Sequence, residues 1–366
     1  MLRRVDGQPG RPLASTLDPK VQAAAERAFT GVTRNAALVA LQASSGEVRA
    51  VVNWPTSGSF DRALLGRYPA GSTFKVITAT ALLDAGVKPD DPVACPPSIT
   101  VEGLTFGNFE GESAAGGIPF HTAFAISCNT AFIGLATRRL SGRQLTAAAA
   151  RYGFGADLPA GLPGATSRVP TPRGKAELAN EAIGQGRVAV TPLQMATVAG
   201  AIANGGVLMA PHVVREIRDA DGRVVRRVGP TEWKRAVQPT TAAAVTQMMI
   251  DVVKRGTGTA AAVPGFTVAG KTGTAEAPPD PADPGNTAPH AWFIGFAPAE
   301  APRFAIAVIV ERGGDLGDEA TGGRVAAPVA GKVLAKLLSL PVAPPPAPPG
   351  EEKPTSTTAG PRPGGR

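Results

Sequence analysis

Residues 68–86 read YPAGSTFKVITATALLDAG, and the prediction for the whole chain is built outward from this stretch. Pro69-Ala70-Gly71 leads into a segment, residues 72–86, whose apolar residues recur at the period of an α-helix. Gly86 follows the last periodic residue, where glycine commonly ends a helix. Ser72 lies in the first turn and Lys75 three residues on, so both side chains project from one face of the predicted helix.

A serine and a lysine at this spacing can act as a nucleophile and its base. A hydroxyl is a poor nucleophile unless a base lies within hydrogen-bond reach. A lysine amine can be that base only where burial or nearby positive charge lowers its pKa. The helix N-terminus adds N–H groups that suit an oxyanion. An isolated Ser-x-x-Lys is more often a capping serine beside a solvated lysine, so the assignment depends on the rest of the chain.

Strand patterns lie at both ends of the chain, with helical patterns between them. A helix begins at Asp18-Pro19, and the runs AALVAL (36–41) and EVRAVV (47–52) predict a hairpin. Residues 87–120 read as an irregular excursion, and the remaining predicted helices are 119–126, 129–140, 191–206, 240–254 and 326–340. Strands are predicted at 266–277, 290–298 and 304–312. This order predicts an α+β fold in which the N-terminal hairpin joins the C-terminal strands in one antiparallel sheet.

Two further polar motifs interrupt these elements. Ser127-Cys128-Asn129 stands between two helical stretches, and its ordinary interpretation is helix capping. Lys271-Thr272-Gly273-Thr274 interrupts a strand, and Gly273 leaves room for a close approach along it. Taken singly, each motif also fits a purely structural role. Together with Ser72 and Lys75 they form the ordered set Ser-x-x-Lys, Ser-x-Asn and Lys-Thr-Gly, which is shared by penicillin-binding proteins and class A β-lactamases.

The flanking residues resemble those of class B penicillin-binding proteins. The similar segments, spread between about Ser15 and Leu340, are STLDPKVQAAAERAF, YPAGSTFKVITATALL, SCNTAF, IGQGRVAVTPLQMATVAGAIANGG, VAGKTGTAE and HAWFIGFAP. The resemblance implies the penicillin-binding protein and serine β-lactamase-like fold. That fold has a five-stranded antiparallel sheet flanked by helices and a mostly helical subdomain.

The resemblance also assigns roles to the motif residues. It implies that Ser72 takes the acyl group of a D-Ala-D-Ala stem peptide and that Lys75 accepts its proton. Ser127 would relay a proton to the departing amine, and Asn129 would hold Lys75 and the substrate amide. Lys271 would keep Lys75 neutral more of the time and attract the substrate carboxylate. That carboxylate would be bound by Thr272 and Thr274, beside Gly273, and the backbone N–H groups of Ser72 and Thr274 would form the oxyanion hole.

The remaining aromatic, histidine and cysteine residues receive smaller roles. Trp292 is expected to line the cleft and bind substrate, and His290 could do so with it. The remaining histidines, His121 and His212, are isolated and are expected to be surface or core residues. Cys95 and Cys128 could form a single bridge in an exported protein, but we expect Cys128 to be a small packing residue that points away from the cleft.

Three functions remain open from the sequence. The favoured one is a D,D-transpeptidase that crosslinks peptidoglycan. A D,D-carboxypeptidase or a β-lactamase would deacylate quickly in water, and a non-enzymatic penicillin sensor would bind without turnover. Class A β-lactamases use a glutamate that activates water. Glu177 is the nearest candidate, but its spacing to Asn180 is one residue short, which favours transfer to an amine.

The composition is that of a globular protein, and the resemblance, not the composition, implies an extracytoplasmic location. The 366 residues carry a formal net charge of +8, yet Lys and Arg are scattered and no zinc-ligand spacing or RNA-binding signature accompanies them, so nucleic acid is not an expected partner. The expected partners are peptidoglycan stem peptides, β-lactam antibiotics and cell-wall synthesis proteins, with no cofactor or metal. Export and membrane association are expected to depend on an N-terminal anchor that this chain lacks. The predicted domains are an N-terminal extension (1–14), a transpeptidase domain (15–340) and a disordered Pro-rich tail (341–366).

Overall fold

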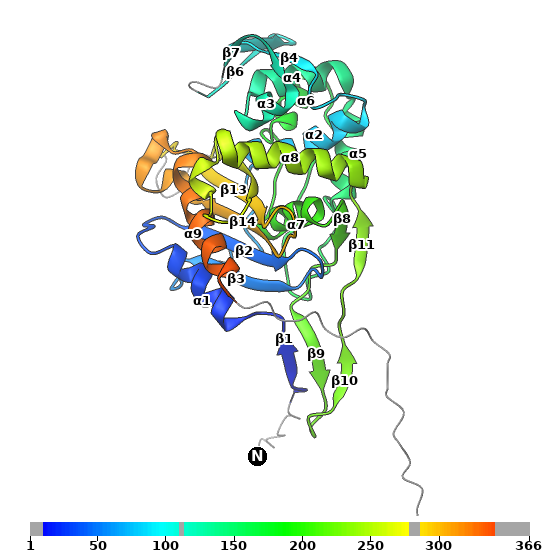
Figure 1. The fold of residues 1–366 in the computed structure, drawn as a ribbon, viewed down its shortest axis with the longest axis vertical. Helices are drawn as coiled ribbons and strands as arrows, with labels where there is room; N and C mark the ends of the chain where they lie inside the picture. Colours follow the sequence, from blue (N-terminus) through cyan, green and yellow to red (C-terminus); the bar gives the residue numbers. More distant parts are fainter. Residues whose placement is uncertain (1–9, 110–112, 278–285, 341–366) are drawn as a thin grey trace, which may run out of the picture.

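The core of the fold is a five-stranded antiparallel sheet built from both ends of the chain (Figure 1). The computed structural model describes residues 10–109, 113–277 and 286–340, so the predicted disorder of the tail at 341–366 lies outside the described residues. The strand order is β12 (Ala269–Ala275), β13 (His290–Ala297), β14 (Phe304–Val310), β2 (Ala36–Gln42) and β3 (Val48–Trp54). The predicted union of the N-terminal hairpin with the C-terminal strands is confirmed.

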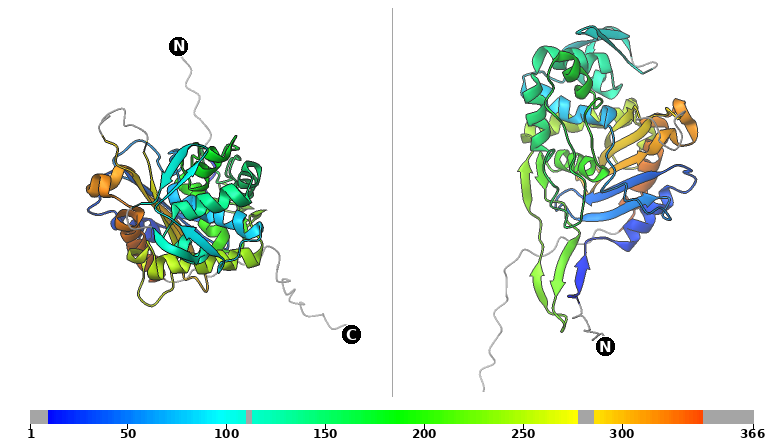
Figure 2. Two further views of the ribbon diagram at one scale, coloured as in Figure 1. Left: turned by 90° about the horizontal axis from the view of Figure 1, so that it is seen from above. Right: turned by 180° about the vertical axis from the view of Figure 1, so that it is seen from behind.

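Both faces of the sheet are covered by helices. Because successive side chains of a strand point to opposite faces, Val39 and Leu41 of β2 belong to one hydrophobic cluster while Leu38 and Ala40 belong to the other. On the first face the sheet packs against α7 (Pro192–Ala203) and α8 (Pro239–Arg255). On the second face it packs against α1 (Pro19–Ala28), which Asp18 caps, and α9 (Ala327–Leu338). Figure 2 shows this layering from two further directions.

A mostly helical lobe lies beyond the first face, at the top of Figure 1. It contains the 3-10 turn η1 (Gly71–Phe74) and the helices α2 (Lys75–Asp84), α3 (Phe120–Ala125), α4 (Asn129–Arg139), α5 (Gly142–Arg151) and α6 (Lys175–Ala182). The excursion expected to be irregular instead forms two small antiparallel pairs. These are β4 (Pro92–Cys95) with β7 (Ala114–Pro119), and β5 (Ser98–Val101) with β6 (Leu104–Gly107).

The pairing of the cysteines differs from our expectation. Cys95 at the end of β4 and Cys128 form a disulfide, with 6.2 Å between their Cα atoms. Cys128 is therefore a crosslinked residue rather than a free packing residue, although it is fully buried as expected. The physical reason is that β4 packs against α4, which brings the two ends of a 33-residue separation together.

A narrow extension projects from the body at the bottom of Figure 1. It is made of β1 (Leu13–Ser15), β9 (Val214–Arg218) and β10 (Val224–Arg227), joined to the body through the pair β8 (Val207–Met209) and β11 (Glu232–Arg235). Leu13 and Ala14 pair with β9, so these two residues belong to the fold and not to the expected N-terminal extension.

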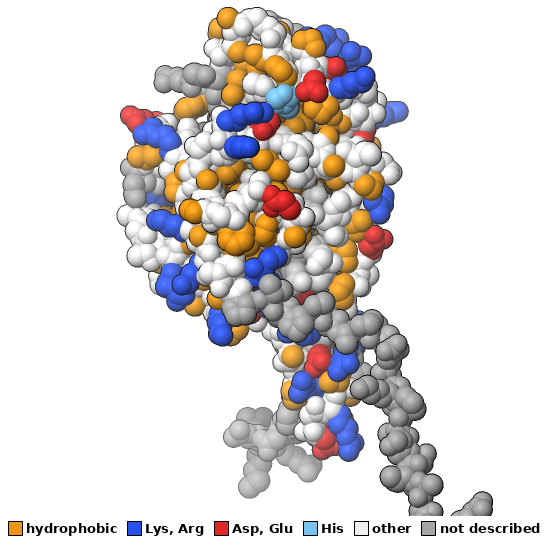
Figure 3. Space-filling model, in the orientation of Figure 1, with side chains coloured by type: hydrophobic (Ala, Val, Ile, Leu, Met, Phe, Trp, Pro, Cys, Tyr) orange, Lys and Arg blue, Asp and Glu red, His pale blue; other side chains and the backbone are white. Residues whose placement is uncertain are grey.

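The surface and helix lengths of the described residues bear on two sequence-based expectations. On the face shown in Figure 3, Lys and Arg side chains are interspersed with acidic and apolar ones, which agrees with the scattered basic residues of the sequence. Among the described residues, no helix combines the length and the apolarity that crossing a membrane requires.

Candidate active site

The nucleophile candidate lies where the helical lobe meets the edge strand β12. Ser72 is partly exposed and lines a cleft of about 1030 Å³. Lys75 is the first residue of α2, and its side chain is fully buried. The predicted helix therefore starts as a 3-10 turn that carries Ser72, and it continues as an α-helix from Lys75.

The Ser-x-Asn motif lies directly against Lys75. The lysine Nζ donates to Ser127 Oγ at 3.2 Å, to Asn129 Oδ1 at 2.7 Å and to the carbonyl oxygen of Ser127. Asn129 Nδ2 in turn donates to the carbonyl oxygen of Gly107 at 3.2 Å. Ser127 has a φ of 65°, in the left-handed region that is costly for a residue with a Cβ. This conformation lets one short loop between α3 and α4 present both a carbonyl and a hydroxyl to the same ammonium.

Lys271 reaches the same hydroxyl from the opposite wall of the cleft. Its Nζ donates to Ser127 Oγ at 2.9 Å and to the carbonyl oxygen of Thr272 at 3.1 Å. Each ammonium also lies over an aromatic ring, Lys75 at 5.4 Å from the centre of Phe132 and Lys271 at 5.7 Å from that of Phe124. Two buried ammonium groups thus converge on Ser127, which is the central electrostatic feature of the site.

The Lys-Thr-Gly motif forms the wall at the edge of the sheet. A Cβ at Gly273 would lie 2.9 Å from Thr73 Cγ2 and 3.1 Å from the carbonyl oxygen of Ala70, so only glycine lets β12 pass this close to the turn that carries Ser72. Thr272 and Thr274 line the cleft and are already hydrogen-bonded. Thr272 Oγ1 lies 2.5 Å from Thr257 Oγ1, and Thr274 Oγ1 accepts from the backbone N–H of Gly322 at 3.3 Å.

The two backbone segments expected to form the oxyanion hole are neighbours. The carbonyl oxygen of Thr274 lies 2.5 Å from the position that a Cβ would take on Gly71, which has a φ of +52°. Ser72 and Thr274 both line the cleft. The arrangement is compatible with their N–H groups meeting one substrate oxygen.

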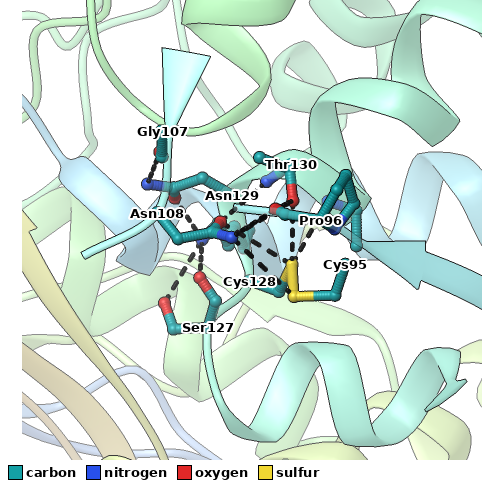
Figure 4. The surroundings of a disulfide bond; sticks show 10 residues. Cys95, Pro96, Gly107, Asn108, Ser127, Cys128, Asn129 and Thr130 are labelled. Atoms are coloured by element: carbon teal, nitrogen blue, oxygen red, sulfur yellow. Dashed lines mark hydrogen bonds between the residues drawn. A yellow bond between two sulfur atoms is a disulfide. The ribbon is translucent and has the colours of Figure 1, made fainter. Parts of the chain in front are cut away.

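The disulfide lies immediately behind the Ser-x-Asn loop (Figure 4). Asn108 connects the two, because its Nδ2 donates to the carbonyl oxygen of Pro96 at 2.8 Å while its Oδ1 accepts from the N–H of Thr130 at 3.0 Å. Cys128 is fully buried and is not among the residues that line the cleft, which agrees with the expectation that its side chain points away from the cleft. The loop that carries Ser127 and Asn129 is therefore braced from behind.

Trp292 corrects one of our site assignments. Its side chain is fully buried, and it is not among the residues that line the cleft. The indole N–H donates to the carbonyl oxygen of Pro69 at 3.0 Å, on the segment just before Ser72. His290 is also buried, and burial lowers its pKa to about 4, so the ring is neutral near pH 7. These two residues lie under the site instead of in it.

Thr257 and Asn108 were missed in the sequence analysis, although both line the cleft. Thr257 stands between Gly256 and Gly258 directly after α8, and that Gly-Thr-Gly run was the available signal. Asn108 lies in the excursion expected to be irregular, and the residues around it gave no signal.

Comparisons with known proteins agree with this geometry. The family model "Penicillin binding protein transpeptidase domain" matches residues 36–335. The peptidoglycan D,D-transpeptidase PbpA of Mycolicibacterium smegmatis is 37% identical, over 89% of this chain and 72% of that protein. The PbpA of Mycobacterium tuberculosis is 36% identical over the same shares.

Solved structures give the same result. Penicillin-binding protein A of M. tuberculosis, in a ceftriaxone acyl-enzyme complex, superposes with a TM-score of 0.82 at 34% identity, covering 90% of this chain and 81% of that one. A D,D-transpeptidase domain from Eggerthella lenta gives 0.80 at 31% identity, over 91% and 84%. The chain belongs to the penicillin-binding protein transpeptidase family.

Proposed function

We propose that this protein is a serine D,D-transpeptidase that crosslinks peptidoglycan through an acyl-enzyme on Ser72. The observation that carries the proposal is the convergence of Lys75 and Lys271 on Ser127, beside a partly exposed Ser72 in the cleft. A serine becomes a competent nucleophile when a base lies beside it. Two close buried ammonium groups disfavour each other's charge, which leaves one amine able to accept a proton.

The acylation step follows from this arrangement. Ser72 Oγ attacks the carbonyl carbon of the D-Ala-D-Ala bond, and its proton passes to Lys75. The N–H groups of Ser72 and Thr274 stabilise the negative oxygen, and one such donor typically contributes about 3 kcal/mol to lowering the barrier. The C–N bond then breaks, and Ser127 passes its proton to the leaving nitrogen of D-alanine while it takes up the proton that Lys75 received from Ser72. The product is an ester between Ser72 and the shortened stem peptide.

The second step consumes that ester. An acceptor amine attacks the ester carbonyl and gives up a proton through Ser127 to Lys75. The new amide bond forms as the C–O bond to Ser72 breaks, and Lys75 returns the proton to Ser72 Oγ. Glu177, the candidate for activating water instead, is ion-paired with Arg187 at 2.7 Å and is not among the residues lining the cleft. Its position therefore supports transfer to an amine over a class A-like hydrolysis.

Substrate recognition is proposed for the Lys-Thr-Gly wall. Lys271, with Thr272 and Thr274, would bind the terminal carboxylate of the stem peptide. Thr257, which pairs with Thr272, would orient that hydroxyl. The peptide backbone would lie along β12, an edge strand of the sheet, as an added strand. β-Lactams would enter by the same route, consistent with the acyl-enzyme complex of the M. tuberculosis relative.

The place of action follows from the proposed substrate. Peptidoglycan lies outside the cytoplasmic membrane, so we propose an extracytoplasmic protein that works at the membrane surface, with cell-wall synthesis proteins as partners. Both proposals depend on the transpeptidase function.

The direct test is covalent labelling with a fluorescent penicillin. We expect the purified protein to be labelled and the Ser72→Ala variant to remain unlabelled, while Ser339→Ala, a serine at the end of α9, serves as the labelled control. Persistent labelling of Ser72→Ala would refute the assignment of the nucleophile. Loss of the wild-type label within seconds would favour a β-lactamase. A stable label without release of D-alanine from a stem pentapeptide and an acceptor amine would favour a sensor.

A further inference from the structure

A carboxylate outside the three motifs, in the connection that follows β14, is hydrogen-bonded to the segment that leads into Ser72. We propose that Glu311 is a positioning residue: through Tyr68 it holds residues 68–71 in the place from which they present Ser72 to the cleft. The inference rests on the proposed function, because its readout is acylation of Ser72.

The first link joins Glu311 to Tyr68. The phenol O–H donates to Glu311 Oε1 at 2.6 Å, and Arg62 Nε donates to the same oxygen at 3.2 Å. The side chains of Arg62 and Glu311 are only 12% and 17% exposed, so water competes little for these contacts. Burial and the neighbouring carboxylate raise the pKa of Tyr68 well above its usual value, so the phenol remains a donor throughout the physiological range.

The second link runs from Tyr68 to Ser72. The backbone N–H and C=O of Tyr68 both pair with Val190, at 2.9 and 2.8 Å. The Tyr68 ring packs edge-on against Trp292, with ring centres 6.0 Å apart, and the Trp292 indole donates to the next carbonyl along, that of Pro69. The N–H of Gly71 then donates to the carbonyl oxygen of Gly184 at 2.9 Å. The buried Trp292, which we had expected to bind substrate, is thus part of the support beneath the nucleophile.

A third contact ties Glu311 to another wall of the cleft. Glu311 directly follows β14 and begins the connection to α9, and Thr321, Gly323 and Arg324 of that connection line the cleft. Two hydrogen bonds donated by backbone N–H groups hold the first residues of this connection in place. The N–H of Glu311 donates to the carbonyl oxygen of Asn35 at 2.8 Å, and that of Arg312 donates to His290 Nδ1 at 3.2 Å. One carboxylate therefore joins two segments that border the same cleft.

The experiment separates positioning from general stability. Acylation by a fluorescent penicillin is followed over a range of concentrations, which gives the first-order rate at saturation and the half-saturating concentration separately. Because a displacement of 1 Å can cost about 100-fold in rate, we expect Tyr68→Phe to slow the saturated rate roughly tenfold without shifting half-saturation. Glu311→Gln, which keeps an oxygen for the phenol, should retain more of the rate than Glu311→Ala.

Two matched controls are available in the chain. Tyr152→Phe removes the hydroxyl of the other tyrosine, which is also buried but lies at the end of α5. Glu216→Gln neutralises a carboxylate that is likewise paired with arginines, in the projecting strand β9. Both should be acylated at the wild-type rate. The double variant Tyr68→Phe/Glu311→Gln should be no slower than Tyr68→Phe alone, because once the phenol hydroxyl is absent the change at Glu311 has no hydrogen bond to Tyr68 left to weaken.

The results that would overturn the inference are distinct from those that would overturn the function. A labelled wild type with an equally fast Tyr68→Phe or Glu311→Ala overturns the inference alone. So does a loss of rate that only mirrors the unfolded fraction measured by circular dichroism at the assay temperature. A wild-type protein that is not labelled at Ser72 contradicts the proposed function and the positioning role with it.

Discussion

At the scale of single residues, Ser127 carries the heaviest demands. It is buried, has a positive φ, and accepts hydrogen bonds from two ammonium groups. Glycine would satisfy the backbone at lower cost, but it has no hydroxyl to offer. Serine therefore keeps a strained conformation for the sake of its side chain, a combination that is common at functional sites.

This conflict between backbone and side chain predicts that glycine at position 127 favours stability over alanine, although both substitutions remove the hydroxyl that acylation needs. Ser127→Gly and Ser127→Ala should both slow acylation by roughly 100-fold or more, since proton transfer by a positioned group contributes about 10² to 10⁴. The glycine variant should nevertheless be the more stable of the two by about 1 kcal/mol, because alanine retains the cost of the left-handed conformation. Chemical denaturation and penicillin labelling of the same preparations measure both quantities. Equal stability of the two variants would mean that the positive φ has no cost.

At the scale of elements, the site depends on how closely β12 approaches the turn η1. Gly273 on the strand, Gly71 in η1 and Gly184 just after α6, which packs against Gly71, each leave less than 3 Å between an added Cβ and the nearest atom. At Gly71 and Gly184 that atom is a backbone oxygen, which cannot rotate away. The loop that carries Ser127 is held by the disulfide, which is a side-chain crosslink. The three motifs are therefore held in place by close backbone contacts at the glycines and by this crosslink.

Gly273→Ala should therefore move the strand away from the nucleophile. We expect the acylation rate to fall and the melting temperature to drop, because overpacking at a close contact costs about 1–3 kcal/mol. Gly229→Ala is the matched control: no atom lies within 4 Å of an added Cβ there, and its φ is outside the positive range. Labelling kinetics and thermal unfolding of both variants test this. A Gly273→Ala protein that behaves like Gly229→Ala would show that the strand can yield without consequence.

At the scale of the whole molecule, two buried titratable groups give stability a pH dependence. His290 has its pKa lowered to about 4 by burial, so its contribution is complete above pH 6.5 and is lost as the pH falls toward 4. Glu181 in α6 shows the opposite behaviour. Burial raises its pKa to about 7 even though Arg187 lies 3.1 Å away, so the folded protein favours the protonated acid.

The raised pKa of Glu181 predicts how the stability of the protein changes with pH. The folded state binds the proton more tightly than the unfolded chain, so stability is lost as the pH rises from about 4.5 to 7. Glu181→Gln removes this loss, and the variant should gain up to ~3 kcal/mol relative to wild type between pH 4.5 and 8. Denaturant unfolding at several pH values measures the difference. Glu232→Gln, at an exposed carboxylate of β11 far from this pair in the chain, is the control, and parallel curves for wild type and Glu181→Gln would contradict the assignment.

Much of the architecture could be predicted from sequence because its signals are local. Asp18 followed by proline marked the start of α1, and the runs of apolar, strand-forming residues at both ends of the chain indicated the sheet. Those signals were weak between residues 87 and 120, where the strands are only four to six residues long. The projecting sheet was not predicted for a similar reason. Its strand β1 has only three residues, and it pairs with a strand about 200 positions away in the sequence.

The site divides in the same way. The residue types and the order of the three motifs were evident from the sequence, and the roles of the motif residues stay predictions that the labelling experiments test. The sequence did not show toward which face of the sheet Trp292 points. All eight residues of β13 are buried, and a strand covered on both faces has no alternation of apolar and polar residues from which the direction of a side chain could be predicted.

The sequence by itself determined the kinds and order of the elements and the set of reactive groups, because helix period, strand alternation and turn residues act over a few neighbouring positions. Only the tertiary structure decided which groups meet: Cys95 with Cys128, Trp292 with Pro69, and Glu311 with Tyr68. Each of these contacts joins positions distant in the chain. Their pairing follows from how the sheet, the helical lobe and the C-terminal connection pack, and no local pattern encodes it.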